Sequence, residues 1–169
     1  HTLVHIYEVI KCLGLEEEGT KSYCAPEVDT AVLFFAAIFH DAIYNPKSST
    51  NEADSAVLFE ELCSLCPDPD AARTEHRRRV ITVILATAKH KYDGEDAAVK
   101  DFLDADIAVL AKDREAYSLY AACIRLEYGH VPRNTYLTER VKVLRNFLKR
   151  ERLYFKDDGR EERARDNLT

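Results

Sequence analysis

The chain has 169 residues, a formal net charge of −6, 46% hydrophobic residues and 32% charged residues. This length suits one domain with a single hydrophobic core, and the acidic balance argues against a broad nucleic-acid-binding face. No apolar run reaches transmembrane length, and no signal peptide is recognisable. We therefore expect one domain over residues 1–169, cytoplasmic, with neither a membrane nor nucleic acid as partner. Because the chain starts at His1 and contains no Met, we expect the native N-terminus to be missing.

Five cysteines are scattered along the chain, and Cys63 and Cys66 form a CxxC. No second CxxC or paired histidine lies near it, so we do not expect a zinc site. A redox motif would need a helix after it, whereas Pro67 and Pro69 follow. We interpret the cysteines as reduced thiols.

Helical periodicity dominates the chain, and strand-like alternation is nearly absent. Glu27 and Asp29 suit the start of the second helix, and Asn51 followed by Asp54 resembles a capping box at the start of the third. Turn signals rich in Gly, Pro and Asn separate the segments. The pattern predicts an all-α helical bundle with helices near 2–13, 28–44, 51–66, 70–90, 95–110, 113–129 and 135–150.

A carboxylate interrupts the apolar stripe of the helix predicted over 95–110. Leu103, Ile107 and Leu110 recur at i, i+4 and i+7, and Asp106 fills the i+3 position. A lone buried carboxylate is costly, so it needs a proton, a hydrogen-bonded partner or a metal. Asp106 is therefore the first candidate for a functional site.

Asp104 competes with Asp106 for this role. The two lie about 200° apart around a helix, so both rarely face one ion. We expect Asp104 on the polar side with Lys100 and Asp101, and we favour Asp106 as the ligand. Whether Asp104 assists stays open.

A second polar anomaly follows the apolar residues 31–39, where His40 and Asp41 appear without a break. Neighbouring helix residues differ by about 100°, so both side chains could touch one ion placed between their directions. His5 lies at the edge of the apolar stripe of the first helix. Each histidine, taken alone, could equally be a hydrogen-bonded core residue.

These side chains offer nitrogen and oxygen donors from three predicted helices and no thiolate. Such a set suits one borderline or hard divalent ion, such as Mn, Co, Ni, Mg or Fe(II), with open positions for water and substrate. The candidate metal ligands are His5, His40, Asp41 and Asp106.

The order of His5, then His40-Asp41, then Asp106 resembles the H…HD…D signature of the HD-domain superfamily of metal-dependent phosphohydrolases. More narrowly, the chain resembles an uncharacterised group of predicted HD-superfamily phosphohydrolases, and the resemblance spans nearly its whole length. The stretches that carry it are residues 1–6, 39–44, 51–56, 103–106, 124–128 and 163–168.

The resemblance implies an HD-type helical core around the ion and hydrolysis of a phosphoester or phosphoanhydride, in a nucleotide or another small phosphorylated metabolite. Metal-bound water would be the nucleophile. Asp41 and Glu52 are the candidate catalytic residues, with Glu52 managing protons; alternatively, Glu52 only complements the helix dipole. Arg125, Lys89 and His90 are the candidates for binding phosphate.

Related two-metal enzymes carry two further histidines between the HD pair and the last Asp, where this chain offers His76 and His90. We expect His76 to be exposed, and the plainest role of His90 is to cap the end of a helix. One ion is therefore expected rather than two. The alternative function is a non-catalytic HD domain that binds a nucleotide-like ligand in a regulatory role. The substrate, the native metal and a homodimer stay open.

Overall fold

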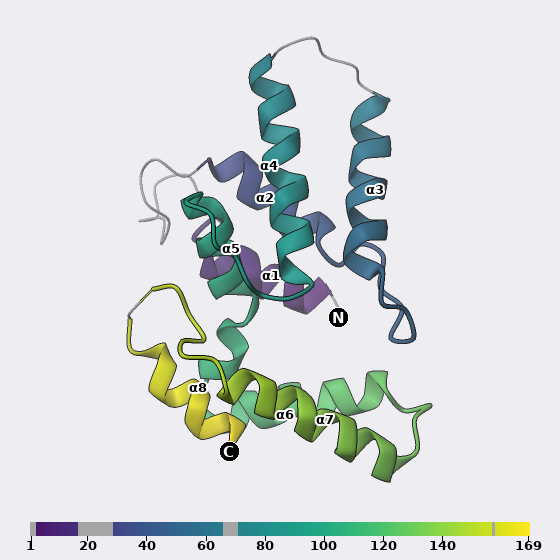
Figure 1. The fold of residues 1–169 in the computed structure, drawn as a ribbon, viewed down its shortest axis with the longest axis vertical. Coiled ribbons are helices and arrows are strands. Elements are labelled where there is room, and N and C mark those ends of the chain that lie inside the picture. The colour runs from purple at the N-terminus through teal and green to yellow at the C-terminus, as the bar shows by residue number, and fades with distance from the viewer. Residues whose placement is uncertain (1–2, 17–28, 66–70, 157) are drawn as a thin grey trace. The chain divides into compact units, whose positions relative to one another are not determined.

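A computed structural model describes residues 3–16, 29–65, 71–156 and 158–169. Their regular structure consists of eight α-helices and one 3-10 helix, without strands, so the predicted all-α class is confirmed (Figure 1). None of the described helices has the length and apolar character needed to cross a bilayer. The chain divides into two compact units, His1–Asp106 and Ile107–Thr169. The single domain over 1–169 stays a prediction.

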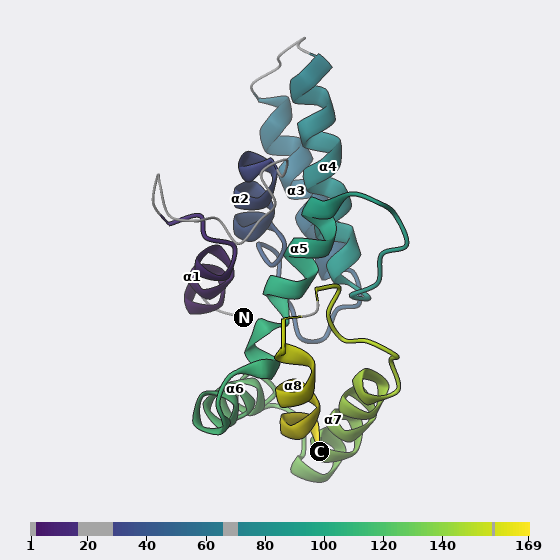
Figure 2. The ribbon, with the colours of Figure 1, turned by 90° about the vertical axis from the view of Figure 1, so that its left-hand side faces the viewer.

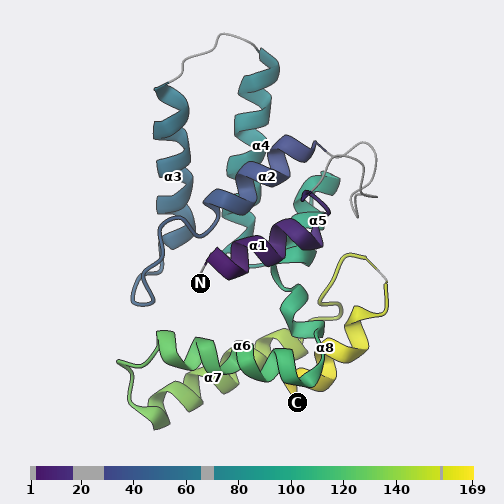
Figure 3. The same ribbon diagram turned by 180° about the vertical axis from the view of Figure 1, so that it is seen from behind.

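The first unit is organised around its fourth helix. That helix packs against the second, third and fifth helices, and the first helix packs against the second and fifth (Figure 3). Val80, Val83 and Ile84 of the fourth helix are fully buried between these neighbours. The helices of this unit are α1 (Leu3–Cys12), α2 (Thr30–Phe39), α3 (Asn51–Ser64), α4 (Ala71–Thr87) and α5 (Ala97–Asp106).

Helix α2 begins as predicted but is not buried on every side. Asp29 Oδ1 accepts hydrogen bonds from the backbone nitrogens of Ala31 and Val32 at 3.0 and 3.4 Å, which confirms it as the cap; Glu27 lies outside the described residues. Phe34 and Phe35 are 42% and 45% exposed. Although residues 31–39 are all apolar, α2 therefore buries only the side that faces α4 and its neighbours.

Two helices end earlier than their apolar periodicity predicts. Helix α2 ends at Phe39 instead of near residue 44, and α5 ends at Asp106 instead of near residue 110. After α5 the carbonyl of Ile107 accepts a hydrogen bond from the Tyr154 hydroxyl at 3.0 Å, and the chain continues as the 3-10 helix η1 (Ala108–Ala111). Apolar spacing continues past both ends, but tertiary hydrogen bonds there replace the helical ones.

The loop after α2 is fastened to α3 by Asn51 and Ser55. Asn51 Oδ1 accepts from the backbone nitrogen of Asn45 at 2.9 Å, and its Nδ2 donates to the carbonyl of Asn45 at 3.0 Å. One turn later, Ser55 Oγ accepts from the nitrogen of Ile43 at 2.9 Å and donates to its carbonyl at 3.3 Å. Both side chains are buried. They satisfy the backbone N–H and C=O groups of Ile43 and Asn45, which lie outside any helix.

The predicted capping role of Asn51 is wrong. Thr50 is the N-cap residue of α3 and makes no capping bond with its side chain; its hydroxyl donates instead to Asp54 Oδ2 at 2.8 Å. Asn51 is already helical, and its amide is engaged with the loop.

The second unit builds its own core around η1, which packs against the sixth and eighth helices, and the eighth also packs against the seventh (Figure 2). The buried cluster consists of Ile107, Leu110, Ala111, Tyr117, Leu153, Tyr154, Ala164 and Leu168. The helices of this unit are α6 (Arg114–Glu127), α7 (Arg133–Leu148) and α8 (Arg160–Leu168).

Helix α8 is absent from the helices predicted from the sequence. Ala164 and Leu168 are its only apolar residues, which is too few to reveal a period. They stand four residues apart, so both reach the core from one face. Gly159, at φ +78°, precedes the helix and turns the chain into it.

We expect Ser55→Ala to lower the free energy of unfolding by about 1–3 kcal/mol, because both hydrogen bonds to the Ile43 peptide group are lost from a buried position. Ser64→Ala is the matched control on the same helix, since Ser64 Oγ donates to the carbonyl of Glu60 at an exposed place. Its effect should stay within about 0.5 kcal/mol. Urea unfolding measures both, and equal losses in the two variants would contradict the role of Ser55.

Candidate metal centre

Three segments of the first unit bring four nitrogen and oxygen donors together. His5 comes from α1, His40 and Asp41 from the turn after α2, and Asp106 from the last residue of α5. These three helices pack against one another. The imidazoles of His5 and His40 and the carboxylate of Asp41 form a group whose geometry could hold a metal ion.

The two histidine nitrogens lie close to each other and to both carboxylates. His5 Nε2 lies 3.2 Å from His40 Nε2, 2.9 Å from Asp106 Oδ1 and 3.8 Å from Asp41 Oδ2. His40 Nε2 lies 3.2 Å from Asp41 Oδ2 and 3.5 Å from Asp106 Oδ1. Ligands bound at about 2.0–2.2 Å lie about 3 Å apart at right angles and about 4.2 Å apart across the ion. The chemistry and spacing of His5, His40 and Asp41 therefore fit a divalent metal, and Asp106 adds an oxygen close to both histidines.

His40 is held with the correct nitrogen facing the other donors. Its Nδ1 donates to the carbonyl of Ala37 at 3.1 Å, which leaves the Nε2 lone pair of the neutral ring directed toward His5 and the carboxylates. The ring is buried and meets Phe102 edge-on at a centroid distance of 5.3 Å. The helix α2 therefore fixes both the tautomer and the orientation of this ligand.

The ends of two helices add negative potential at this place. Helix α2 ends immediately before His40, and α5 ends at Asp106. The unpaired carbonyls of a helix C-terminus carry partial negative charge and favour a nearby cation. Local backbone electrostatics and the two carboxylates thus act in the same direction.

His90 also reaches these donors. It follows the end of α4, and its Nε2 lies 2.7 Å from Asp106 Oδ2. The sequence does not predict this contact, since no local pattern connects two residues 16 positions apart on different segments. His76, by contrast, is exposed as predicted and pairs with Asp29.

The charges around His40 and Asp106 shift both pKa values. Burial alone lowers the pKa of His40, but hydrogen bonds and charges from Asp106 and Asp41 more than offset it and raise that pKa to about 10. Burial likewise opposes ionisation of Asp106, yet hydrogen bonds from His40, His5 and His90 hold its pKa well below the usual range. Without a metal, the site therefore retains a proton on His40 as its positive charge.

The expectation that Asp104 and Asp101 lie on a polar side of the helix is wrong. They are 1% and 3% exposed, because α5 packs against α1, α2 and α4 and is covered well beyond one stripe. It is nevertheless the Asp106 carboxylate that lies 2.9 Å from His5.

Two of the other predicted residues lie in the first unit. Glu52 is half-buried in the first turn of α3, next to Asn51, and Lys89 is exposed beside His90. The proton-transfer role of Glu52 and the phosphate-binding role of Lys89 stay predictions.

Arg125 belongs to the second unit, where it donates hydrogen bonds to the turn between α6 and α7. Its Nη1 donates to the carbonyl of Tyr128 at 2.6 Å and its Nη2 to the carbonyl of Val131 at 3.2 Å. The guanidinium also lies 4.8 Å from the ring centre of Tyr136. These contacts explain the residue structurally, and its role in binding phosphate stays a prediction.

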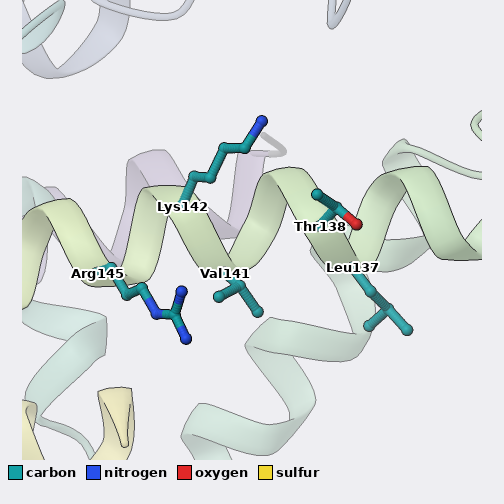
Figure 4. A pocket seen from close by; sticks show the side chains of 5 residues that line it. All are labelled: Leu137, Thr138, Val141, Lys142 and Arg145. Carbon is teal, nitrogen blue, oxygen red and sulfur yellow. The ribbon is translucent and has the colours of Figure 1, made fainter.

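Two surface hollows do not include the donor group. One runs along α7, and all five of its lining residues come from that helix (Figure 4): Leu137, Thr138, Val141, Lys142 and Arg145. The other lies among α2, α3 and α4 over an apolar floor that includes Phe35, Phe59 and Val80. Neither offers a carboxylate, so neither resembles a metal site.

No family model, curated protein or solved structure matches the chain. The chemistry of the donor group therefore rests on its own geometry.

The metal-free protein should become less stable as the pH rises from about 6.5 to about 10. The raised pKa of His40 means that its protonated form stabilises the fold fully below pH 6.5, and this contribution is lost as the ring deprotonates near pH 10. A divalent ion must displace that proton, so binding should release about one proton and strengthen about tenfold per pH unit between pH 6 and 8. Titration calorimetry in buffers of different ionisation enthalpy measures the release; binding without proton release would contradict this electrostatic picture.

Asp106→Asn should abolish metal binding, because the amide removes a negative charge and an anionic oxygen from the donor group while preserving its shape. Asp104→Asn, the same change two residues earlier in the helix, should leave most of the metal bound in the folded protein, although burial of Asp104 predicts some loss of stability. Elemental analysis of folded, size-fractionated protein decides between them. Equal metal content in wild type and Asp106→Asn would exclude Asp106 as a ligand.

Proposed function

We propose that the protein is a metal-dependent phosphohydrolase of the HD-superfamily type. Its substrate would be a phosphoester or phosphoanhydride of a nucleotide or another small phosphorylated metabolite. The observation that carries the proposal is that His5 and His40 lie 3.2 Å apart, and that each lies within 3.8 Å of both Asp41 and Asp106, in the chain order of the motif. The sequence motif requires this order of residues along the chain, and binding to one ion requires that their donor atoms lie close together.

The donor set also limits the metal. Two imidazoles and two carboxylates suit one Mn, Co, Ni, Mg or Fe(II) ion and would leave positions for water and for a phosphoryl oxygen. When bound, such an ion lowers the pKa of a ligated water and polarises a phosphoryl oxygen. The residues themselves hold the donors in place: the Ala37 carbonyl orients His40, and the loop anchored by Ser55 carries Asp41.

A phosphohydrolase has two further tasks that need other side chains. A proton must be moved, and Glu52 is our candidate for that step. A phosphate group needs cationic donors, for which Lys89, His90 and Arg125 are the candidates from the sequence. Of these, Lys89 and His90 follow the end of α4, and the His90 ring contacts Asp106.

Metal analysis followed by a hydrolysis screen tests the proposal. Purified protein should contain about one divalent ion per chain, and nucleotides and sugar phosphates should release phosphate when Mn, Co, Ni, Mg or Fe(II) is present. A chelator should abolish turnover, and the ion should restore it. Bound metal without hydrolysis of any phosphorylated compound would favour a regulatory HD domain, and absence of metal binding would reject the site.

Glu52→Gln separates proton transfer from a structural role. If Glu52 is the general acid or base, metal content stays unchanged and kcat falls by about 10²–10⁴, because the amide cannot exchange the proton. If Glu52 only complements the dipole of α3, the change instead costs about 0.3–1 kcal/mol of stability. Glu60→Gln, two turns along the same helix and exposed, is the control that should change neither quantity. Full turnover by metal-loaded Glu52→Gln would remove Glu52 from the mechanism.

A further inference from the structure

His90 adopts a backbone conformation that its side chain disfavours. Its φ is +47°, and among the described residues no other non-glycine residue has a positive φ. The residue forms the turn that follows α4, where its backbone nitrogen donates to the carbonyl of Ala86 at 3.0 Å. Glycine usually occupies this left-handed position because it has no Cβ to clash. A histidine persists there only if its ring makes an interaction that offsets the strain.

The interaction of the ring is with Asp106. His90 Nε2 lies 2.7 Å from Asp106 Oδ2, and both side chains are largely buried, at 20% and 10% exposure. The other oxygen, Oδ1, lies 2.9 Å from His5 Nε2 and 3.5 Å from His40 Nε2. The two oxygens of one carboxylate are thus divided between His90 and the candidate ligands. A carboxylate at the end of a helix could otherwise rotate about its χ2 torsion and exchange its oxygens.

We propose that His90 is a positioning residue: its Nε2–H donates to Asp106 Oδ2 and thereby holds Oδ1 toward His5 and His40. This inference rests on the proposed metal function, and it assigns His90 to the carboxylate rather than to a substrate phosphate. Partners that orient a ligating carboxylate typically change metal affinity by 10–100-fold when they are removed. The left-handed turn after α4 is then the means by which the ring reaches Asp106.

Two substitutions of equal length isolate the donated hydrogen bond. His90→Gln keeps an N–H donor near the position of Nε2, and His90→Met has a similar length but no donor, while both share the same backbone strain. Co²⁺ titration of the full chain, followed through the visible ligand-field absorption, gives the affinity and reports the coordination geometry. We expect His90→Met to bind Co²⁺ about 10–100-fold more weakly with an altered spectrum, and His90→Gln to recover most of the affinity.

His90→Gly separates the side chain from the backbone. Glycine accepts the left-handed conformation, so this variant should melt no lower than His90→Met and yet bind Co²⁺ as weakly. His76→Ala, which removes an exposed histidine from α4, should leave the affinity unchanged. Wild-type affinity in His90→Met and His90→Gly would overturn the inference, and a raised KM with an unchanged affinity would make His90 a substrate contact. A His90→Gln variant as weak as His90→Met would also overturn it, because the ring itself would then be required.

A metal-free measurement tests the same contact if the proposed function fails. The decrease in melting temperature caused by His90→Met should shrink in an Asp106→Asn background, because the hydrogen bond to the carboxylate is already weakened there. An undiminished decrease would overturn the contact even when wild type binds Co²⁺. A diminished decrease, with no Co²⁺ bound by wild type, would reject the metal function while retaining the His90–Asp106 link.

Discussion

The imidazole nitrogens of His5 and His40 lie 3.2 Å apart, and each lies 2.9–3.8 Å from both carboxylates inside the first unit. This approach is favourable only with a positive charge among them. In the metal-free protein that charge is a proton, as the raised pKa of His40 indicates. A divalent ion would supply the charge without using a nitrogen lone pair for a proton. Proton and metal therefore compete for one place, which explains why the pH dependence of stability and of metal affinity should be coupled.

The surrounding backbone is arranged to make this approach possible. Helix α2 stops just before His40, and α5 stops at Asp106, so that both segments end where the donors meet. Ser55 and Asn51 hold the loop that carries the chain away from Asp41. Each of these arrangements interrupts a helix whose apolar pattern would have continued. Such local conflicts between propensity and structure are typical of functional sites.

The polar side chains of the candidate site have a different task from Arg125 and Tyr154 of the second unit. In the first unit, the polar groups described at the candidate site are charged side chains whose interactions depend on pH and on ions. In the second unit, Arg125 and the hydroxyl of Tyr154 instead satisfy backbone carbonyls around turns. A guanidinium that donates hydrogen bonds to two carbonyls stabilises a turn without any ligand. The proposed chemistry is accordingly placed in the first unit, and a contribution of Arg125 to substrate binding would require it to keep or exchange these bonds.

The sequence by itself determined the all-α class and the chain order of the four donors. Both depend on local patterns, since helical periods are read over a few turns and a polar residue within an apolar stripe, such as Asp106, stands out from its neighbours. Helix ends were harder to predict, because the hydrogen bonds that replace the helical ones come from residues such as Ser55 and Tyr154, far along the chain.

The tertiary structure alone decided which buried groups meet. Asp104 is buried although its helical position indicated solvent, because neighbouring helices cover α5 well beyond one stripe. His90 lies against Asp106 because a left-handed turn directs its ring there, and no sequence period encodes that turn in a histidine. The local hydrophobic pattern identifies a polar residue at an apolar position. Its partner is set by packing between segments that are distant in the chain, and that packing determines the chemistry of the site.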